Sequence, residues 1–189
     1  MEWYKAAERF TDALSSSDPT PGGGAAAAMA GAMGCALAMM AVETTLKRKA
    51  TPQDIKTKLE PGLKKLASLR EQLKSYIQLD GNAYAAFLAA KKLPKENPTR
   101  EQAVQDALLF AARVPADTAT TALTCLREAD ALKELVAPVI LSDVYCAQHL
   151  LKACIRCSVE SIKANLEFIT HADQKQKLEQ QVSNFLKSC

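Results

Sequence analysis

The 189-residue sequence has few aromatic residues and little excess charge of either sign. Phe, Trp and Tyr make up 5% of the chain, and 24 basic residues nearly balance 21 acidic ones, giving a formal net charge of +3. Proteins that bind nucleic acid combine a dense basic patch with aromatic side chains on which bases stack. The sequence has neither pattern, so nucleic acid is not an expected partner.

The sequence also lacks the alternation of apolar and polar residues that is typical of β-strands. Apolar residues recur at helical spacing along almost the whole chain, and glycine and proline gather at a few points. No repeat or low-complexity linker divides the chain. Residues 1–189 are therefore predicted to form one all-α domain, an antiparallel bundle of about five to six long helices.

The glycine and proline breaks set the limits of the expected helices. These helices cover residues 3–14, 25–49, 52–91, 98–135, 142–169 and 173–187. We expect Thr51 and Ser142 to be N-caps, because their hydroxyls suit the unpaired N–H groups of a helix start. Pro61 and Pro115 are expected to kink their helices. In the first helix, Ala6, Ala7, Phe10 and Leu14 are predicted to share one face.

Six cysteines lie on predicted helices, and the N-terminal segment lacks the apolar core of a secretory signal. We therefore expect a cytoplasmic protein with reduced thiols. Cys154 and Cys157 have redox or metal spacing, but no second pair accompanies them, so both are interpreted as small buried apolar residues. His149 is interpreted as an interior or interface residue and His171 as a cap at a helix C-terminus. No metal site is predicted.

The uncharged run from Ala25 to Val42 is the one segment that suggests a membrane span. It consists mainly of Ala, Gly and Met, and its 18 residues are at the lower limit for crossing a bilayer. We interpret it as a central helix buried on all sides, so a membrane is not an expected partner.

The most informative segment directly precedes this helix and reads Ser-Asp-Pro-Thr-Pro-Gly-Gly-Gly over residues 17–24. Prolines stiffen the approach, and glycines permit backbone angles that other residues rarely adopt. The N–H groups at a helix start are unpaired and carry a partial positive charge. Pro21, Gly22, Gly23 and Gly24 are therefore predicted to form a loop before the central helix that binds an anionic or carbonyl-bearing ligand.

Several stretches from about Phe10 to Ile169 together match one family in order. They are Pro19–Gly24, Ala28–Gly34, Asp80 with Ala83-Tyr84, Leu93–Lys95, Arg113–Pro115, Ser142-Asp143 and Asn165-Leu166. In these features the chain resembles the cyclodeaminase/cyclohydrolase family of folate enzymes. This family includes the C-terminal domain of formiminotransferase-cyclodeaminase and stand-alone methenyltetrahydrofolate cyclohydrolases.

The resemblance implies an all-helical homodimer with a folate site in a groove near the subunit interface. It also implies one of two reactions. In the cyclodeaminase, N10 of 5-formiminotetrahydrofolate attacks the formimino carbon and ammonia leaves, giving 5,10-methenyltetrahydrofolate. In the cyclohydrolase, water adds to the methenyl carbon and the ring reopens to 10-formyltetrahydrofolate. Neither reaction needs a cofactor beyond the tetrahydrofolate derivative, which is the substrate.

Both reactions pass through a tetrahedral carbon between two nitrogens, so they need a group that gives and takes a proton. Asp80 and Asp143 are the candidates. Asp80 lies late in a core-spaced helix, where a carboxylate is costly unless it is paired or functional. Its alternative role is to pair with a lysine or a nearby helix terminus. Asp143 lies in a first helical turn, where its charge is favourable without any catalytic role.

Five further residues are candidates for substrate binding, each with a structural alternative where the sequence offers one. Arg113 either clamps a carboxylate or lies on a solvated helix face. Lys95 either meets the glutamate tail of folate or is solvated. Tyr84 either lines the pterin pocket or packs in the core. Ser142 either contacts substrate or caps its helix. Asn165 is implied by the resemblance alone.

The chain departs from the family pattern at several polar positions. Ala137 and Val139 stand where asparagines are common, Ala25 replaces a serine, Gln78 an acidic residue, and Ser161 an asparagine. Two classes of function therefore stay open. One is a folate one-carbon enzyme, and the other is a non-catalytic helical dimer that binds folate or a protein partner.

Overall fold

A computed structural model describes residues 2–189 and confirms the all-α fold. Its elements are α1 (Glu2–Ser15), α2 (Gly23–Lys47), α3 (Gln53–Lys91), α4 (Arg100–Leu132), the 3₁₀ turn η1 (Pro138–Ile140), α5 (Leu141–Leu166) and α6 (Ala172–Lys187). No strand occurs within the described residues.

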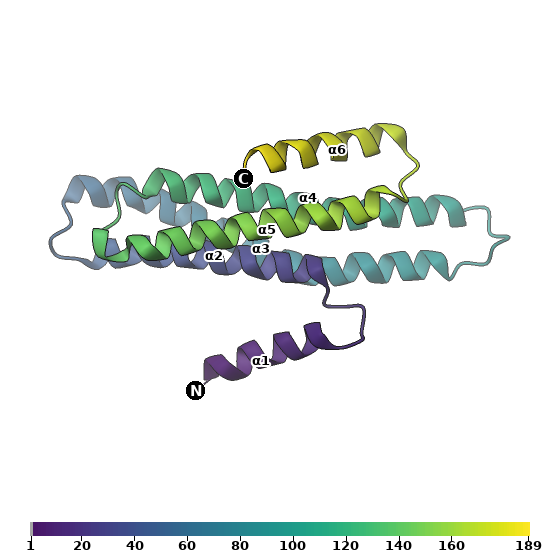
Figure 1. The fold of residues 1–189 in the computed structure, drawn as a ribbon, viewed down its shortest axis with the longest axis horizontal. Helices are drawn as coiled ribbons and strands as arrows, with labels where there is room; N and C mark the ends of the chain where they lie inside the picture. The colour runs from purple at the N-terminus through teal and green to yellow at the C-terminus, as the bar shows by residue number, and fades with distance from the viewer. Residues whose placement is uncertain (1) are drawn as a thin grey trace.

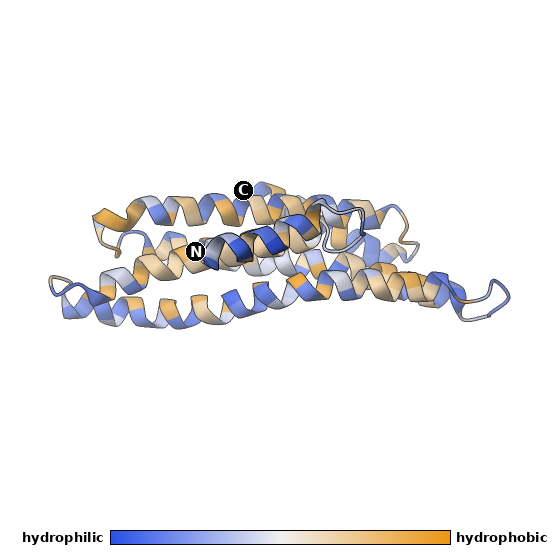
Figure 2. Cartoon of the chain, turned by 90° about the horizontal axis from the view of Figure 1, so that it is seen from below, coloured by the Kyte–Doolittle hydropathy of each residue, from blue (hydrophilic) through white to orange (hydrophobic). Residues whose placement is uncertain are grey.

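Helices α2 to α5 form an antiparallel four-helix bundle (Figure 1). Both α2 and α4 pack against α3 and α5, and the short connections make consecutive helices antiparallel. The connection between α3 and α4 is hydrophilic, whereas the four helices carry hydrophobic residues along their whole length (Figure 2). The C-terminal helix α6 packs on α4 and α5 through Leu178, Val182 and Phe185.

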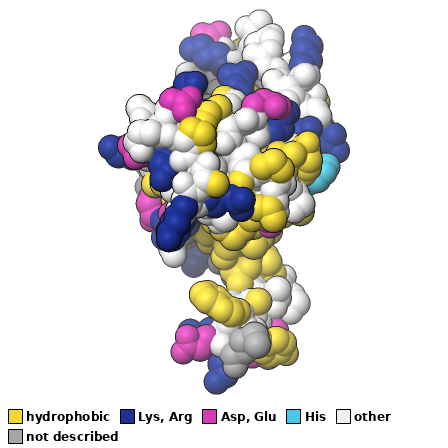
Figure 3. Space-filling model, turned by 90° about the vertical axis from the view of Figure 1, so that its left-hand side faces the viewer, with side chains coloured by type: hydrophobic (Ala, Val, Ile, Leu, Met, Phe, Trp, Pro, Cys, Tyr) yellow, Lys and Arg dark blue, Asp and Glu magenta, His cyan; other side chains and the backbone are white. Residues whose placement is uncertain are grey.

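The first helix does not join the bundle. α1 buries none of its residues, and it projects from the bundle at the end of a loop (Figure 1). The face that carries Ala6, Ala7, Phe10 and Leu14 is therefore not buried within residues 2–189. Hydrophobic side chains occur both on α1 and on the adjoining part of the bundle (Figure 3). Helical periodicity reports an apolar face correctly, but it does not say whether another element of the same chain covers that face.

Helix α2 packs closely against α5 because its small residues allow the two backbones to approach. A Cβ atom placed on Gly34 would lie 2.9 Å from the Ala147 carbonyl oxygen, and one on Gly31 would lie 2.8 Å from Cys154 Sγ. α2 is long and apolar enough to cross a membrane, but 61% of its most apolar stretch is buried inside the protein. Gly31 and Gly34 therefore allow close helix packing at the centre of the bundle.

Two predicted N-caps have other roles. The hydroxyl of Thr51 donates to the Thr45 carbonyl at 2.7 Å, and α3 begins two residues later. Ser142 is the second residue of α5, because η1 continues directly into that helix and leaves Ile140 at the N-cap. The prediction of Ser142 as an N-cap is therefore wrong.

A buried threonine fixes the connection between α4 and α5. The Thr45 hydroxyl donates to the Ala41 carbonyl at 2.8 Å and accepts a hydrogen bond from the Ala137 N–H at 2.9 Å. A buried backbone N–H is costly without a partner, so Thr45 stabilises the buried chain at Ala137. This contact sets the position at which α5 begins.

The close α2–α5 contact makes Gly34 sensitive to substitution. We expect Gly34→Ala to lower the free energy of unfolding by about 1–3 kcal/mol, because the added methyl group forces the helices apart. Urea unfolding followed by circular dichroism measures the change. Gly23→Ala is the matched control, since a Cβ there meets nothing within 4 Å and should cost no stability. Equal stability of both variants would contradict the close packing.

Candidate active site

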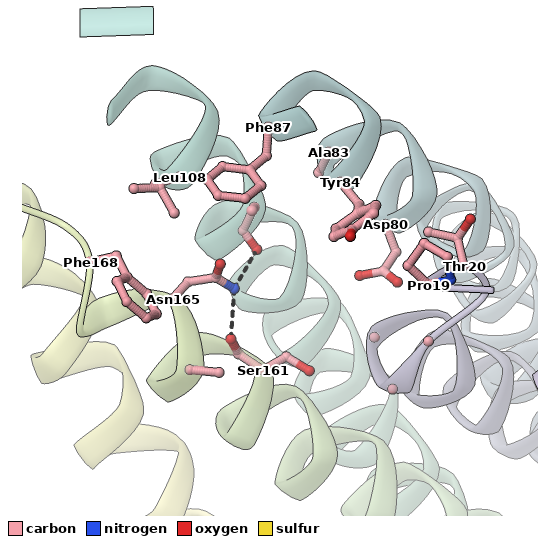
Figure 4. A pocket seen from close by; sticks show the side chains of 15 residues that line it. Pro19, Thr20, Asp80, Ala83, Tyr84, Phe87, Leu108, Ser161, Asn165 and Phe168 are labelled. Atoms are coloured by element: carbon pink, nitrogen blue, oxygen red, sulfur yellow. Dashed lines mark hydrogen bonds between the residues drawn. The ribbon is translucent and has the colours of Figure 1, made fainter. Parts of the chain in front are cut away.

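A cavity of about 340 Å³ opens at the N-terminus of α2 (Figure 4). It exists because α2 has 25 residues whereas α3 has 39, so the last turns of α3 extend past the start of α2. The cavity walls come from the glycine loop, from α3 between Asp80 and Phe87, from Leu108 and Ala111 of α4, and from residues 161–168.

The carboxyl group of Asp80 is bound to the start of α2. The Ala25 N–H donates to Asp80 Oδ2 at 3.0 Å, and a Cβ on Gly24 would overlap this carboxyl group. No glycine among the described residues has a positive φ, so Gly24 is needed for space and not for an unusual backbone angle. The N–H groups at the start of this helix were expected to be open to a ligand, but the N–H of Ala25 is occupied by Asp80.

The position of Asp80 is therefore compatible with both of its predicted roles. It pairs with a helix terminus, and it also lines the cavity. Burial raises the pKa of this carboxyl group, and the hydrogen bond from Ala25 opposes that rise in pKa. A carboxyl group with a raised pKa beside a cavity is suited to exchange protons with a bound molecule.

Asn165 forms a polar wall opposite this carboxyl group. Its Nδ2 donates to the Ser161 carbonyl at 2.9 Å and to the Ala111 carbonyl at 3.3 Å (Figure 4). The Ala111 carbonyl is free to accept because Pro115, four residues later, has no N–H. Both α3 and α4 continue through their internal prolines. Within residues 2–189 the Asn165 Oδ1 accepts no hydrogen bond, so it is available to a ligand.

Aromatic side chains form the rest of the wall. Tyr84 lines the cavity and is 36% exposed, which favours the pocket role over the core role. Phe87 and Phe168 approach from α3 and from just beyond α5 (Figure 4). Neither residue was predicted to line the site, because their spacing is the same as that of core residues. Flat aromatic faces suit a planar ring system.

The cavity continues towards the hydrophilic end of the bundle. Phe87 and Phe168 also line a neighbouring hollow of about 290 Å³, which includes Lys91, and the Lys91 Nζ lies 5.9 Å from the centre of the Phe87 ring. Gln105 connects this hollow with a polar one of about 400 Å³ that contains Lys95. Lys95 therefore lies beyond the cavity, in the last of three hollows that adjoin one another through shared lining residues.

Asp143 and Ser142 do not reach the cavity of their own chain. They lie in the first turn of α5, whereas Ser161 and Asn165 lie near its end. The 18 residues from Asp143 to Ser161 span about 27 Å of helix. The sequence could not reveal this separation, because a motif states order along the chain and not distance.

Two other predicted binding residues also lie outside the cavity. Arg113 is exposed on α4 and donates to Gln174 Oε1 of α6 at 3.3 Å. Pro21 follows a cis peptide bond and is half-buried next to the cavity, which its neighbours Thr20 and Gly22 line instead. The substituted family position Gln78 is exposed on α3.

Thiols and imidazoles do not form a metal site here. Among residues 2–189 no cluster of His, Cys, Asp and Glu could hold a metal ion. Cys154 is buried, and burial raises its pKa to about 12, but Cys157 is exposed, contrary to expectation. His149 is exposed on α5, and His171 stands at the N-cap of α6, so its predicted role as a C-terminal cap is wrong.

Known proteins resemble the chain over most of its length. Methenyltetrahydrofolate cyclohydrolase of Methylorubrum extorquens is 39% identical over 169 residues, which are 84% of this chain and 77% of that protein. Formimidoyltransferase-cyclodeaminase of Rattus norvegicus is 29% identical over 185 residues, and the chain spans only 33% of its length. The crystal structure of formiminotetrahydrofolate cyclodeaminase from Thermotoga maritima matches with a TM-score of 0.86 at 26% identity, covering 96% of this chain and 88% of that one.

A family model agrees with these individual relatives. The model described as formiminotransferase-cyclodeaminase matches residues 6–184, which include every wall of the cavity. The chain therefore belongs to the formiminotransferase-cyclodeaminase family.

Proposed function

We propose that the protein is a folate one-carbon enzyme that hydrolyses 5,10-methenyltetrahydrofolate to 10-formyltetrahydrofolate. The observation that carries this proposal is a half-buried carboxyl group, Asp80, in an aromatic cavity that adjoins two hollows containing lysines. Hydrolysis is favoured because the relative with 39% identity is a cyclohydrolase. Cyclodeaminase activity is the second candidate, supported by the TM-score of 0.86 to a cyclodeaminase.

The cavity and the two hollows beyond it fit the parts of a folate in order. The pterin and the one-carbon unit lie between Asp80 and Asn165, where polar atoms face each other across the cavity. The benzoyl ring lies between Phe87 and Phe168. The glutamate carboxylates extend towards Lys91 and Lys95, whose charges are opposite.

Asp80 accepts and returns the proton in this mechanism. Its carboxylate takes a proton from the attacking water as the oxygen bonds to the methenyl carbon. The Asp80 carboxyl group then protonates N5 as the bond between N5 and this carbon breaks. The hydroxyl group on the carbon loses its proton through the Asp80 carboxylate to solvent, which leaves the formyl group on N10 and releases one proton overall. In the cyclodeaminase reaction the same group takes the proton from N10 and delivers it to the departing ammonia. The N–H of Ala25 orients the carboxyl group throughout.

We also propose that the protein is a cytoplasmic homodimer that needs no cofactor. All six cysteines are free thiols, which suits a reducing compartment. The exposed side chains of Met33 and Met40 form an apolar surface on α2, which supports the dimer. The competing proposal, a folate-binding dimer without activity, gives saturable folate binding and no turnover of either substrate.

Turnover tests the proposed reaction directly. The purified chain should lower the absorbance of 5,10-methenyltetrahydrofolate faster than buffer alone, and Asp80→Asn should lower kcat by about 10²–10⁴-fold because the proton acceptor is lost. A parallel assay with 5-formiminotetrahydrofolate measures ammonia release. Asp54→Asn, an exposed carboxylate on the same helix, is the control. Wild-type turnover by Asp80→Asn would exclude Asp80 from the mechanism.

The aromatic side chains of Phe87 and Phe168 should affect substrate binding more than the chemical step. We expect Phe168→Ala to raise KM by about 2–10-fold with little change in kcat, since an aromatic pair contributes about 0.5–1.5 kcal/mol. Phe110→Ala on the outer side of α4 should leave both constants unchanged. Steady-state kinetics measures the two effects. Equal KM values for both variants would argue against a benzoyl site between Phe87 and Phe168.

The raised pKa of Asp80 also predicts how stability depends on pH. A protonated Asp80 favours the folded state below the unfolded pKa, and this contribution is lost as pH rises through the folded pKa. The stability of Asp80→Asn relative to wild type should therefore increase between pH 4 and pH 7. Urea unfolding across this range measures the difference. A constant difference would contradict a raised pKa.

A further inference from the structure

The connection between α5 and α6 carries one aromatic wall of the cavity. It consists of residues 167–171, between Leu166 at the end of α5 and Ala172 at the start of α6. Phe168 in this connection lines both the cavity and the adjoining hollow (Figure 4). The Phe168 side chain is 63% exposed, so packing of its own ring does little to fix it. Its position therefore depends on the groups that hold the backbone of the connection.

The side chain of Gln105 on α4 holds this backbone through two hydrogen bonds. Its Nε2 donates to the Phe168 carbonyl oxygen at 3.1 Å, and its Oε1 accepts from the Thr170 N–H at 2.9 Å. The two bonds flank Ile169, whose side chain is buried in the core. Ile169 anchors the connection by apolar packing, while Gln105 fixes a backbone group on either side of it. A chain held at three consecutive residues has little freedom to turn Phe168 away from the cavity.

A primary amide matches these two backbone groups, whereas a carboxylate does not. A carbonyl oxygen needs a donor and an N–H needs an acceptor, and the glutamine amide supplies one of each. A carboxylate at the same position has no donor, so one of its oxygens would face the Phe168 carbonyl oxygen. Gln105 lies one turn before Leu108, which lines the cavity. The hydrogen bonds of Gln105 therefore fix Phe168 relative to a helix that itself forms a wall of the site.

The surroundings of Gln105 also suggest a direct contact with a bound molecule. The residue adjoins the two hollows that contain Lys91 and Lys95. Both polar atoms of its amide group, however, are engaged by the connection between α5 and α6. The contribution of Gln105 to binding is therefore expected to pass through Phe168.

We propose that Gln105 is a positioning residue that sets the affinity for substrate by holding Phe168 at the cavity. This inference rests on the proposed function, in which the benzoyl ring lies between Phe87 and Phe168. Without the two hydrogen bonds the connection is free to move, so binding must also order it, and affinity falls. The chemical step is not affected, because Asp80 is held separately by the Ala25 N–H.

A double-mutant cycle tests whether Gln105 acts through Phe168. Gln105→Ala and the isosteric Gln105→Glu should each raise KM for 5,10-methenyltetrahydrofolate by about 2–10-fold with little change in kcat, the range expected for Phe168→Ala itself. In the Phe168→Ala background, Gln105→Ala should cause no further rise in KM, because the ring that it positions is gone. Gln102→Ala is the control, since Gln102 bonds to Asp106 at the exposed surface of the same helix. No rise in KM, or an equal rise with and without the Phe168 ring, would overturn the proposal.

Amide hydrogen exchange tests the contact independently of turnover. The Thr170 N–H should exchange with solvent about 10-fold faster in Gln105→Ala than in the wild type or in Gln102→Ala, because it loses its acceptor. Faster exchange in a chain that turns over neither folate substrate would refute the proposed function, while the hold of Gln105 on the connection stands. Turnover with unchanged Thr170 exchange in Gln105→Ala would overturn the positioning role alone.

Discussion

The contact between the Asp80 carboxyl group and the start of α2 determines much of this structure. It satisfies the Ala25 N–H at a helix terminus, where donors lack partners within the helix. It requires glycine at position 24, because any side chain would occupy the space of the carboxyl group. It also places the start of α2 beside the longer helix α3, so the cavity opens where the carboxyl group lies. Helix capping and site formation are therefore one interaction.

A second constraint fixes the opposite wall. Pro115 removes one N–H from α4, and the Ala111 carbonyl that would have accepted from it binds the Asn165 amide. A proline inside a helix normally costs stability, and here the side chain from α5 offsets part of that cost. The Asn165 side chain cannot rotate freely while its amide group donates hydrogen bonds to two carbonyl groups. Its remaining oxygen is therefore presented to the cavity in a fixed direction.

The sequence was sufficient to predict the helices and one end of the site, but not which faces meet. Apolar spacing identifies α2 to α6 within a few residues, and the glycine loop with Asp80, Tyr84 and Asn165 does form the cavity. Phe87 was missed because aromatic cavity residues and core residues have the same periodicity. Ser142 and Asp143 were grouped with the site by motif, although helix length separates them from it. Pattern gives identity and order, whereas distance depends on packing.

The two ends of α5 lie far apart, and only one of them reaches the cavity. Its 26 residues span about 39 Å, with the Ser-Asp motif in the first turn and Asn165 in the last. Only the last turns of α5 therefore form a wall of the cavity. A straight helix transmits any shift at one end to the other. Thr45 holds the chain just before α5 through the Ala137 N–H, so this buried hydroxyl also helps to place Asn165 at the cavity.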